Sequence, residues 1–434
     1  MSRPTLSVIG LGYLGATHAI CMADLGYDVV GLDIDAAKID ALANGAVPFF
    51  EPGLDELLGK VLPTGRLRFT TSYDDVVGAD VHFLCVGTPQ RKGEYAADTS
   101  YVDAAVASLA SRVGKPCTVV GKSTVPVGTA ERVARQFSDL DVELVWNPEF
   151  LREGWAIEDT LHPDRLVFGV TSERGEKTMR EVFAPIIETG VPVVITDLAT
   201  AQLVKVAANA FLATKISFIN AMAEVCETVH ADVKKLSEAL SYDERIGGRF
   251  LHAGLGFGGG CLPKDIRAFM ARAGELGADQ ALTFLTEVDA INQRRRARMV
   301  DLTRELLDDS LAGRRIGVLG AAFKPHSDDI RDSPALDVAS RLHRAGAHVT
   351  VYDPAALANA RRDYPALDYA DSAVEAAAEA DAVLHLTEWP EFVQMDPDVL
   401  GAVVRRRNVL DGRNALDVAR WRAAGWHYRA LGRP

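Results

Sequence analysis

Cys261 is the residue whose surroundings most clearly suggest covalent chemistry. It stands in GFGGGCLPKD (256–265), between a run of glycines and a Pro-Lys-Asp sequence. Pro263 suits the first turn of a helix, so Cys261 is expected at a helix N-terminus, where the dipole and unpaired amides favour a thiolate. Lys264 adds positive charge, and Asp265 is a candidate base. The pattern indicates an activated nucleophile; a glycine-rich phosphate-binding loop with an incidental cysteine is the alternative.

The other four cysteines do not share this setting. Cys21, Cys85, Cys117 and Cys226 lie in apolar segments and are expected to be small core residues. Their irregular spacing predicts neither a disulfide framework nor a metal site. We therefore expect no bound metal and a reducing, cytoplasmic compartment.

A second candidate site lies near the N-terminus, where residues 5–35 predict strand, tight turn, helix and strand. Gly10, Gly12 and Gly15 form G-x-G-x-x-G at the turn, and Asp33 ends the next strand, 23 positions after Gly10. This context predicts a pyrophosphate at the helix N-terminus and ribose hydroxyls on Asp33. A carboxylate there repels a 2′-phosphate, so NAD is favoured over NADP; a similar fold without any dinucleotide is the alternative.

Three further strands are predicted in DVHFLCVG (80–87), CTVVGKSTVP (117–126) and VELVWNPEF (142–150). Ligands of open parallel sheets bind at the carboxyl ends of the strands. The polar residues expected at those ends are Thr88, Ser123, Thr124, Asn147 and Glu149. Turn capping explains each of them singly, and only the set favours a site.

Residues 199–231 predict one long helix with apolar side chains on nearly every face, which indicates burial or a subunit interface. Lys205 and Asn209 stand one turn apart on one face of it. We interpret Lys205 as functional, with a lysine that reaches solvent at a domain boundary as the alternative. The basic run NQRRRARM (292–299) is expected to be a solvated face.

The last third of the chain repeats the first design. RRIGVLGAAFKP (314–325) predicts a strand and turn, and EADAVLHLTEWP (379–390) resembles GADVHFLCVGTP (78–89). The full glycine fingerprint is missing, so this copy is expected to have lost dinucleotide binding. Lys324 and Arg331 suit a phosphate-bearing ligand, or else cap a helix.

The whole chain has 434 residues, too many for one core. Its net charge of −13 argues against nucleic acid or an anionic membrane surface as partner. No apolar run approaches the ~20 residues of a membrane span, and no signal peptide is recognised. The predicted fold is α/β, with two Rossmann-like doubly wound domains (1–198 and 312–434) and a central helical region (199–300).

Seven motifs carry a resemblance over nearly the whole chain: GLGYLG (10–15), FEPGLDELL (50–58), KSTVPVGT (122–129), NPEFLREG (147–154), LVKVAANAFLATKISFIN (203–220), GFGGGCLPKD (256–265) and AFKPHSDDIRDSPA (322–335). Together they resemble the UDP-glucose/GDP-mannose dehydrogenase family. The resemblance implies a four-electron oxidation in which UDP-glucose, two NAD⁺ and water give UDP-glucuronate and two NADH. It also implies a homodimer formed through the central helix.

The resemblance further implies roles for individual residues. The catalytic set is Cys261 as nucleophile, Lys205 and Asn209 at the oxyanion, Asp265 as base or water ligand, and Thr124 and Glu149 at the hydrolytic water. The cofactor set is Gly10, Gly12, Tyr13, Leu14, Gly15, Asp33, Lys38, Thr88, Thr124, Glu153 and Arg331. The substrate set is Glu149, Phe150, Leu151, Glu153, Lys205, Asn209, Arg245, Phe250, Gly258, Lys324 and Arg413, of which Arg245 reaches a neighbouring subunit. Gly260 departs from the serine that many relatives carry.

Three alternatives stay open. The same chemistry on GDP-mannose or a UDP-N-acetylhexosamine is the first, although the loop before Cys261 lacks the histidine associated with N-acetylhexosamine oxidation. A non-catalytic UDP-sugar-binding protein is the second, and it would not need Cys261, Lys205 and Asp265 together. A single-step hydroxyacid-type dehydrogenase is the third, and it leaves the thiol unexplained.

Overall fold

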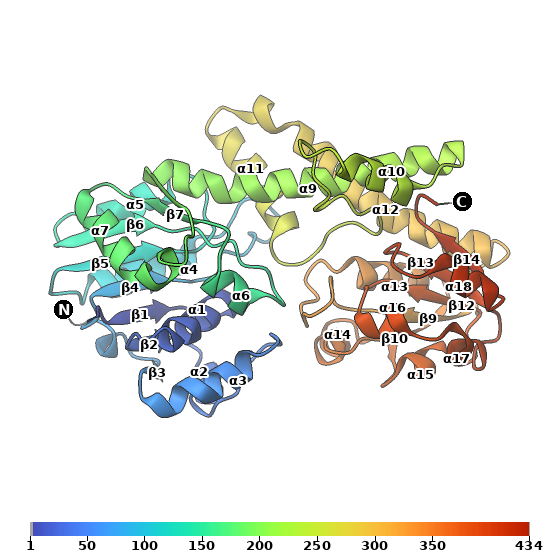
Figure 1. Ribbon diagram of the computed structural model, residues 1–434, viewed down its shortest axis with the longest axis horizontal. Helices are drawn as coiled ribbons and strands as arrows, with labels where there is room; N and C mark the ends of the chain where they lie inside the picture. Colours follow the sequence, from blue (N-terminus) through green and yellow to red (C-terminus); the bar gives the residue numbers. More distant parts are fainter. Residues whose placement is uncertain (1–2, 434) are drawn as a thin grey trace. The chain divides into compact units, whose positions relative to one another are not determined.

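The computed structural model describes residues 3–433, which form two compact units (Figure 1). The first contains residues 3–208 and 267–277, and the second contains residues 209–266 and 278–433. Two helices therefore begin in one unit and end in the other. The limits of the three domains expected from the sequence remain a prediction.

The first unit is built on an eight-stranded sheet of order β3-β2-β1-β4-β5-β6-β7-β8. Every neighbouring pair is parallel except β6 and β7. The strands are β1 Leu6–Ile9, β2 Val29–Leu32, β3 Leu67–Thr70, β4 Val81–Leu84, β5 Cys117–Gly121, β6 Val142–Trp146, β7 Leu166–Gly169 and β8 Val193–Thr196. Strands β1 to β6 have the order of a dinucleotide-binding sheet, as the sequence predicted.

Helices cover both faces of this sheet, because successive residues of its strands belong alternately to two apolar clusters. Val8 and Phe83 belong to one apolar cluster, while the next residues, Ile9 and Leu84, belong to another. Successive side chains of a strand point to opposite faces, so each cluster is the core on one side. The helices of this unit are α1 Tyr13–Asp24, α2 Ala36–Ala43, α3 Leu54–Val61, α4 Ser100–Ala110, α5 Thr129–Gln136, α6 Ala156–Leu161, α7 Glu173–Val182 and α8 Ala184–Ile187.

The second unit repeats the design in a six-stranded parallel sheet of order β11-β10-β9-β12-β13-β14. The strands are β9 Arg315–Leu319, β10 His348–Tyr352, β11 Asp368–Tyr369, β12 Ala382–His385, β13 Asn408–Asp411 and β14 His427–Ala430. The helices C-terminal to β9 are α13 Pro334–Arg344, α14 Leu357–Asp363, α15 Ala373–Ala377, α16 Pro390–Gln394, α17 Pro397–Gly401 and α18 Val418–Ala423. Strand β12 pairs with β9 as β4 pairs with β1, which explains the two similar sequences.

Helix α9 (Leu198–Val229) is close to the predicted long helix and crosses from the first unit into the second. It is followed by α10 (Val233–Ser241), α11 (Leu262–Glu275) and α12 (Phe284–Leu306). By length and composition α9 could also span a membrane, which the sequence analysis did not expect. Its most apolar window is 44% buried inside the protein, and a core helix passes the same test, so this one helix is weak evidence for a span.

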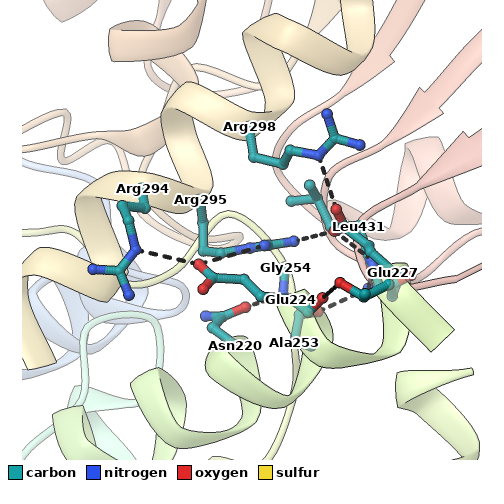
Figure 2. A network of polar contacts seen from close by, with 12 residues as sticks. Asn220, Glu224, Glu227, Ala253, Gly254, Arg294, Arg295, Arg298 and Leu431 are labelled. Atoms are coloured by element: carbon teal, nitrogen blue, oxygen red, sulfur yellow. Dashed lines mark hydrogen bonds and ion pairs between the residues drawn. The ribbon is translucent and has the colours of Figure 1, made fainter. Parts of the chain in front are cut away.

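The basic run at 292–299 is not a solvated face, and that expectation was wrong. Asn292, Arg295 and Arg296 on α12 are 0%, 1% and 3% exposed. Arg295 donates to Glu227 of α9 at 2.6 Å, and the amide of Gly432 donates to the same carboxylate at 3.0 Å (Figure 2). The burial of these arginines is tolerated because carboxylates and carbonyls accept hydrogen bonds from their guanidinium groups.

Candidate active site

The turn after β1 has the shape that a pyrophosphate needs. Gly10 adopts φ +90°, and a methyl group on Gly15 would overlap the carbonyl of Gly10, so neither position tolerates a side chain. Helix α1 then starts at Tyr13 with Gly12 as its N-cap and no side chain capping it. No described atom lies within 4 Å of the place where a Gly12 Cβ would stand. A helix start with open amides fits a dinucleotide phosphate.

Asp33, directly after β2, is 8% exposed and is held from inside. Its carboxylate accepts from the amides of Leu11 at 2.8 Å and Asp35 at 3.0 Å, and from the Lys38 ammonium at 2.8 Å. Burial raises the pKa of Asp33, but the bond from Lys38 and the two amides outweigh it, so the pKa lies below its ordinary value. The group is an anion fixed at the strand end, as the ribose role requires.

The ends of β4 and β5 are joined by hydroxyl groups. Thr88 donates to the carbonyl of Thr124 at 2.6 Å, and Ser123 donates to the carbonyl of Val86 at 2.6 Å. These bonds support the turn-capping interpretation of Thr88 and Ser123. Thr124 is half-buried at the same edge, and its role at a water remains a prediction.

A buried ion pair lies where β5 and β6 end. Lys122, whose side chain is 3% exposed, lies 2.9 Å from Glu149 Oε2 and donates to Asn147 Oδ1 at 3.0 Å. The other carboxylate oxygen of Glu149 accepts from the amides of Phe150 at 2.8 Å and Leu151 at 3.1 Å. Glu149 is therefore fixed in place on both oxygens. Lys122 was not among the predicted site residues, although a lysine at the end of a buried strand is itself a signal.

Tyr13 and Glu51 hold the loop that follows. The Tyr13 hydroxyl is bonded to the Glu51 carboxylate, and Glu51 accepts from the amides of Gly154 at 2.6 Å and Ala156 at 2.8 Å. The neighbouring Glu153 is half-buried. Glu51 was missed as a site residue; its presence as an acid in an otherwise apolar segment was the available signal.

Lys205 lies on α9 within the first unit, with its ammonium 5.5 Å from the centroid of the Phe150 ring. The Arg165 guanidinium lies over the same ring at 3.8 Å. Cations over an aromatic face are attracted to it. The structure thus brings Lys205 to Phe150, two residues predicted to share the substrate site.

In the second unit, Cys261 directly precedes α11 and is exposed, whereas the other four cysteines are buried, as predicted. Asp265 is 2% exposed and accepts from Asn209 Nδ2 at 2.6 Å and from Lys264 Nζ at 2.6 Å. The candidate nucleophile and the candidate base therefore lie within one turn of the same helix start, and the candidate amide reaches that base from α9. Lys264 is committed to Asp265 as an ion pair.

Arg331 packs against the backbone beside the thiol. A methyl group on Gly260 would overlap its guanidinium, which is ion-paired with Asp329 at 2.6 Å. A serine at 260 would therefore meet the end of an exposed, flexible side chain and not the backbone. Lys324 lies on the loop after β9, with its ammonium 5.5 Å from the Phe323 ring centroid.

Arg413 follows β13 and binds three backbone carbonyls. It donates to the carbonyls of Leu386 at 2.7 Å, Gly256 at 3.0 Å and Phe323 at 3.0 Å. These bonds join three loops at one sheet edge. A direct contact between Arg413 and the substrate stays a prediction, and the structure adds a loop-holding role that the sequence did not suggest.

Two predicted substrate residues lie on the segment after α10. The Arg245 side chain is 89% exposed and pairs with Asp243 at 2.6 Å. Phe250 adopts φ +65°, which is uncommon for a non-glycine residue. Gly258 is buried in the loop before Cys261.

Asp353 explains why the second sheet is a poor dinucleotide site. It ends β10 as Asp33 ends β2, but it is 1% exposed. Its carboxylate accepts from the amides of Ala321 and Ala322 at 2.7 and 2.9 Å and from the Trp389 indole at 3.1 Å. These three bonds are to one oxygen, and the other accepts from the amides of Ala355 and Ala356 at 2.9 Å. Both oxygens are therefore occupied by groups of the protein, which supports the expectation of lost dinucleotide binding.

Three family models match the chain in order. They are the NAD binding domain of the UDP-glucose/GDP-mannose dehydrogenase family over residues 4–187, its central domain over 199–294 and its UDP binding domain over 317–418. The first model covers the Gly10 turn and Asp33, and NAD as the cofactor is confirmed.

Individual relatives agree over the full length. A UDP-glucose 6-dehydrogenase of Rhizobium meliloti (strain 1021) is 44% identical and covers 99% of each chain. The structure of a UDP-glucose dehydrogenase from Pyrobaculum islandicum has a TM-score of 0.91 at 37% identity and covers 100% of this chain and 98% of that one. That of a UDP-D-ManNAc dehydrogenase from Pyrococcus horikoshii has a TM-score of 0.86 at 28% identity and covers 99% of both.

Proposed function

Because this chain belongs to the UDP-glucose/GDP-mannose dehydrogenase family, with NAD as its cofactor, we propose that it oxidises UDP-glucose to UDP-glucuronate in two steps. The observation that carries the proposal is the exposed thiol of Cys261 at the start of α11, with Asp265 in the same turn and Asn209 of α9 bonded to Asp265. A one-step alcohol oxidation has no use for such a thiol.

The thiol accounts for the second oxidation. Bound NAD supplies the hydride acceptor in both steps. After the primary alcohol has become an aldehyde, the Cys261 sulfur adds to its carbon to give a thiohemiacetal, and loss of the second hydride leaves a thioester on the sulfur. Water then cleaves the C–S bond, which releases the carboxylate and restores the thiol.

Asp265 and Asn209 are assigned to the proton transfers at this centre. Asp265 is buried, so its carboxylate is strengthened as an acceptor by low dielectric. Asn209 Nδ2 and Lys264 Nζ each bind one of its two oxygens, which fixes the orientation of the carboxylate. Lys205 and Asn209 are the proposed donors to the oxygen that becomes negative when sulfur or water adds; such donors are each worth about 3–4 kcal/mol.

Glu149 and Thr124 are assigned to the hydrolytic water. Lys122 and two amides fix the Glu149 carboxylate, so a water placed by it would have one position. A base of this kind works through position more than through mobility. The remaining proposed substrate contacts are Phe150, Leu151, Glu153, Arg245, Phe250, Gly258, Lys324 and Arg413.

We also propose a cytoplasmic homodimer formed through α9. Exposed apolar residues recur along α9 in the second unit at helical spacing: Phe211, Phe218, Val225 and Val229 are 67%, 49%, 53% and 62% exposed. A contiguous apolar stripe of this kind is typical of an interface. A reactive thiol on the surface also favours a reducing compartment.

The test is the ratio of NADH formed to sugar consumed. Two NADH per UDP-glucose are expected from the intact protein, and Cys261→Ala should yield no UDP-glucuronate. One NADH per sugar would refute the two-step reaction. A parallel panel with GDP-mannose and UDP-N-acetylhexosamines separates the substrate alternatives, and faster NADH release with either of those would replace UDP-glucose as the substrate.

A further inference from the structure

The loop that carries Cys261 is held by side chains that the mechanism does not use. Asn292 of α12 is fully buried, and its Oδ1 accepts from the amide of Phe257 at 2.8 Å while its Nδ2 donates to the carbonyl of the same residue at 2.9 Å. One side chain thus satisfies both polar groups of one loop residue. Asn220 of α9 adds a bond from the Gly254 amide at 2.9 Å.

Arg296, one turn after Asn292, extends this hold to a second segment. Its Nη2 donates to the carbonyls of Phe257 at 3.2 Å and Asp332 at 3.3 Å, and its Nη1 donates to Asp332 Oδ1 at 2.7 Å. The amide of Gly259 donates to the carbonyl of Arg331 at 2.8 Å. The thiol loop and the segment at 331–332 are therefore connected through one guanidinium that is 3% exposed.

The glycines of the loop fit this arrangement. Gly256 adopts φ +88°, and a methyl group there would overlap Asn292 Oδ1. A methyl group on Gly258 would overlap the carbonyl of Asp332. The loop therefore has glycines at these positions because buried polar groups contact its backbone and leave no room for a Cβ atom. Glycine-rich backbone is otherwise the most conformationally free in a protein, so it needs such fixing to present a side chain in one place.

We propose that Asn292 and Arg296 are positioning residues for Cys261, holding its loop in register with the 331–332 segment. The proposal rests on the function proposed above, in which Cys261 is the nucleophile. Their phase on α12 supports it, because Asn292 and Arg296 continue the buried stripe formed by Val288 and Met299. Polar side chains at core positions are retained where they bond to buried backbone groups.

The test compares Asn292→Ala and Arg296→Lys with two matched controls. Asn408→Ala removes another buried amide, which stands at the start of β13 and donates to the carbonyl of Asp381 at 2.9 Å and not to the thiol loop. Arg295→Lys changes the buried neighbour of Arg296 that bonds to Glu227 instead of the loop (Figure 2). Each variant is assayed for melting temperature, for kcat and KM, and for the rate at which iodoacetamide alkylates Cys261 without substrate.

Misplacing a reacting group by about 1 Å costs about 100-fold in rate, so Asn292→Ala should lower kcat by about that factor with KM for NAD unchanged. Its alkylation rate should fall by roughly tenfold, because the sulfur leaves the helix start that favours the thiolate. Arg296→Lys should show the same changes to a smaller degree, since lysine keeps the charge but lacks the planar set of N–H donors of the guanidinium. Both controls should keep wild-type kcat and alkylation rate at a comparable loss of melting temperature.

The proposal is overturned if the Asn292 and Arg296 variants lose only melting temperature, or if the controls lose alkylation rate equally. If Asn292→Ala does not fold, Arg296→Lys against Arg295→Lys decides the matter. Alkylation of Cys261 needs no substrate. A wild-type protein that forms no NADH from UDP-glucose would therefore refute the proposed function, while the alkylation rates of the variants and controls would still test the positioning role.

Discussion

The buried ion pair between Lys122 and Glu149 should contribute far more to stability than an exposed pair of shorter distance. Replacing Lys122 by Met keeps most of the side-chain volume and leaves Glu149, 16% exposed, without its cation. Breaking a buried pair from one side costs about 3–5 kcal/mol. Two amides still bind the carboxylate, so we take the lower end, about 3 kcal/mol. For a unit of this size that corresponds to a fall of about 6–12 °C in melting temperature.

The matched control is Lys60→Met. Lys60 lies 2.6 Å from Asp24, closer than Lys122 lies to Glu149, but its side chain is 68% exposed. An exposed pair is worth at most about 1 kcal/mol, so this variant should melt within about 4 °C of the wild type. Calorimetry measures the melting temperature of both variants. The transition of the first unit is recognised because bound NAD raises its melting temperature.

A double variant completes the test. Glu149→Gln added to Lys122→Met removes the unpaired charge, so the pair of changes should recover about 1–2 kcal/mol relative to the sum of the single changes. If Lys122→Met melts no lower than Lys60→Met, or if the two changes are additive, burial does not govern this pair and the reasoning fails.

Three other changes have defined outcomes. Gly256→Ala forces a left-handed backbone on alanine, at about 1–2 kcal/mol, and overlaps a buried side-chain amide of α12, so both the melting temperature of the second unit and alkylation of the thiol should fall; wild-type values for both would contradict the packing described. Gly260→Ser should keep activity and lie within about 0.5 kcal/mol of the wild type, because the guanidinium of Arg331 is 64% exposed and can move aside; a large loss in calorimetry would mean that it cannot. Burial raises the pKa of Asp411, but the hydrogen bond and charge of His385 and two amides outweigh it and hold that pKa below its ordinary value. The carboxylate therefore stabilises the fold above about pH 4, and this stabilisation is lost as the pH falls through the folded pKa. Asp411→Asn should have a lower melting temperature than the wild type at neutral pH, and its melting temperature should fall less on acidification. Melting temperatures of the two proteins that run parallel over a pH series would refute this.

The sequence by itself determined the elements and the position of the candidate nucleophile. Apolar runs and turn residues predicted both sheets, because strand alternation and glycine turns are local properties. Gly10, Gly15 and Asp33 identified the cofactor edge for the same reason. Pro263 placed Cys261 at a helix start, since a proline is accepted there and not further inside.

Only the tertiary structure decided which polar residues are buried and which groups they bind within each unit. Lys122, Asn292 and Arg296 are buried because they bind partners from strands and loops far away in the sequence. Composition alone predicts that such polar residues are exposed. The run at 292–299 was misjudged for this reason: a charge is placed by the groups that can satisfy it, and these are known only once the chain is folded. Arg413 bonds to three loop carbonyls, a role that depends on distant loops and that the sequence did not suggest, while its expected contact with the substrate stays a prediction.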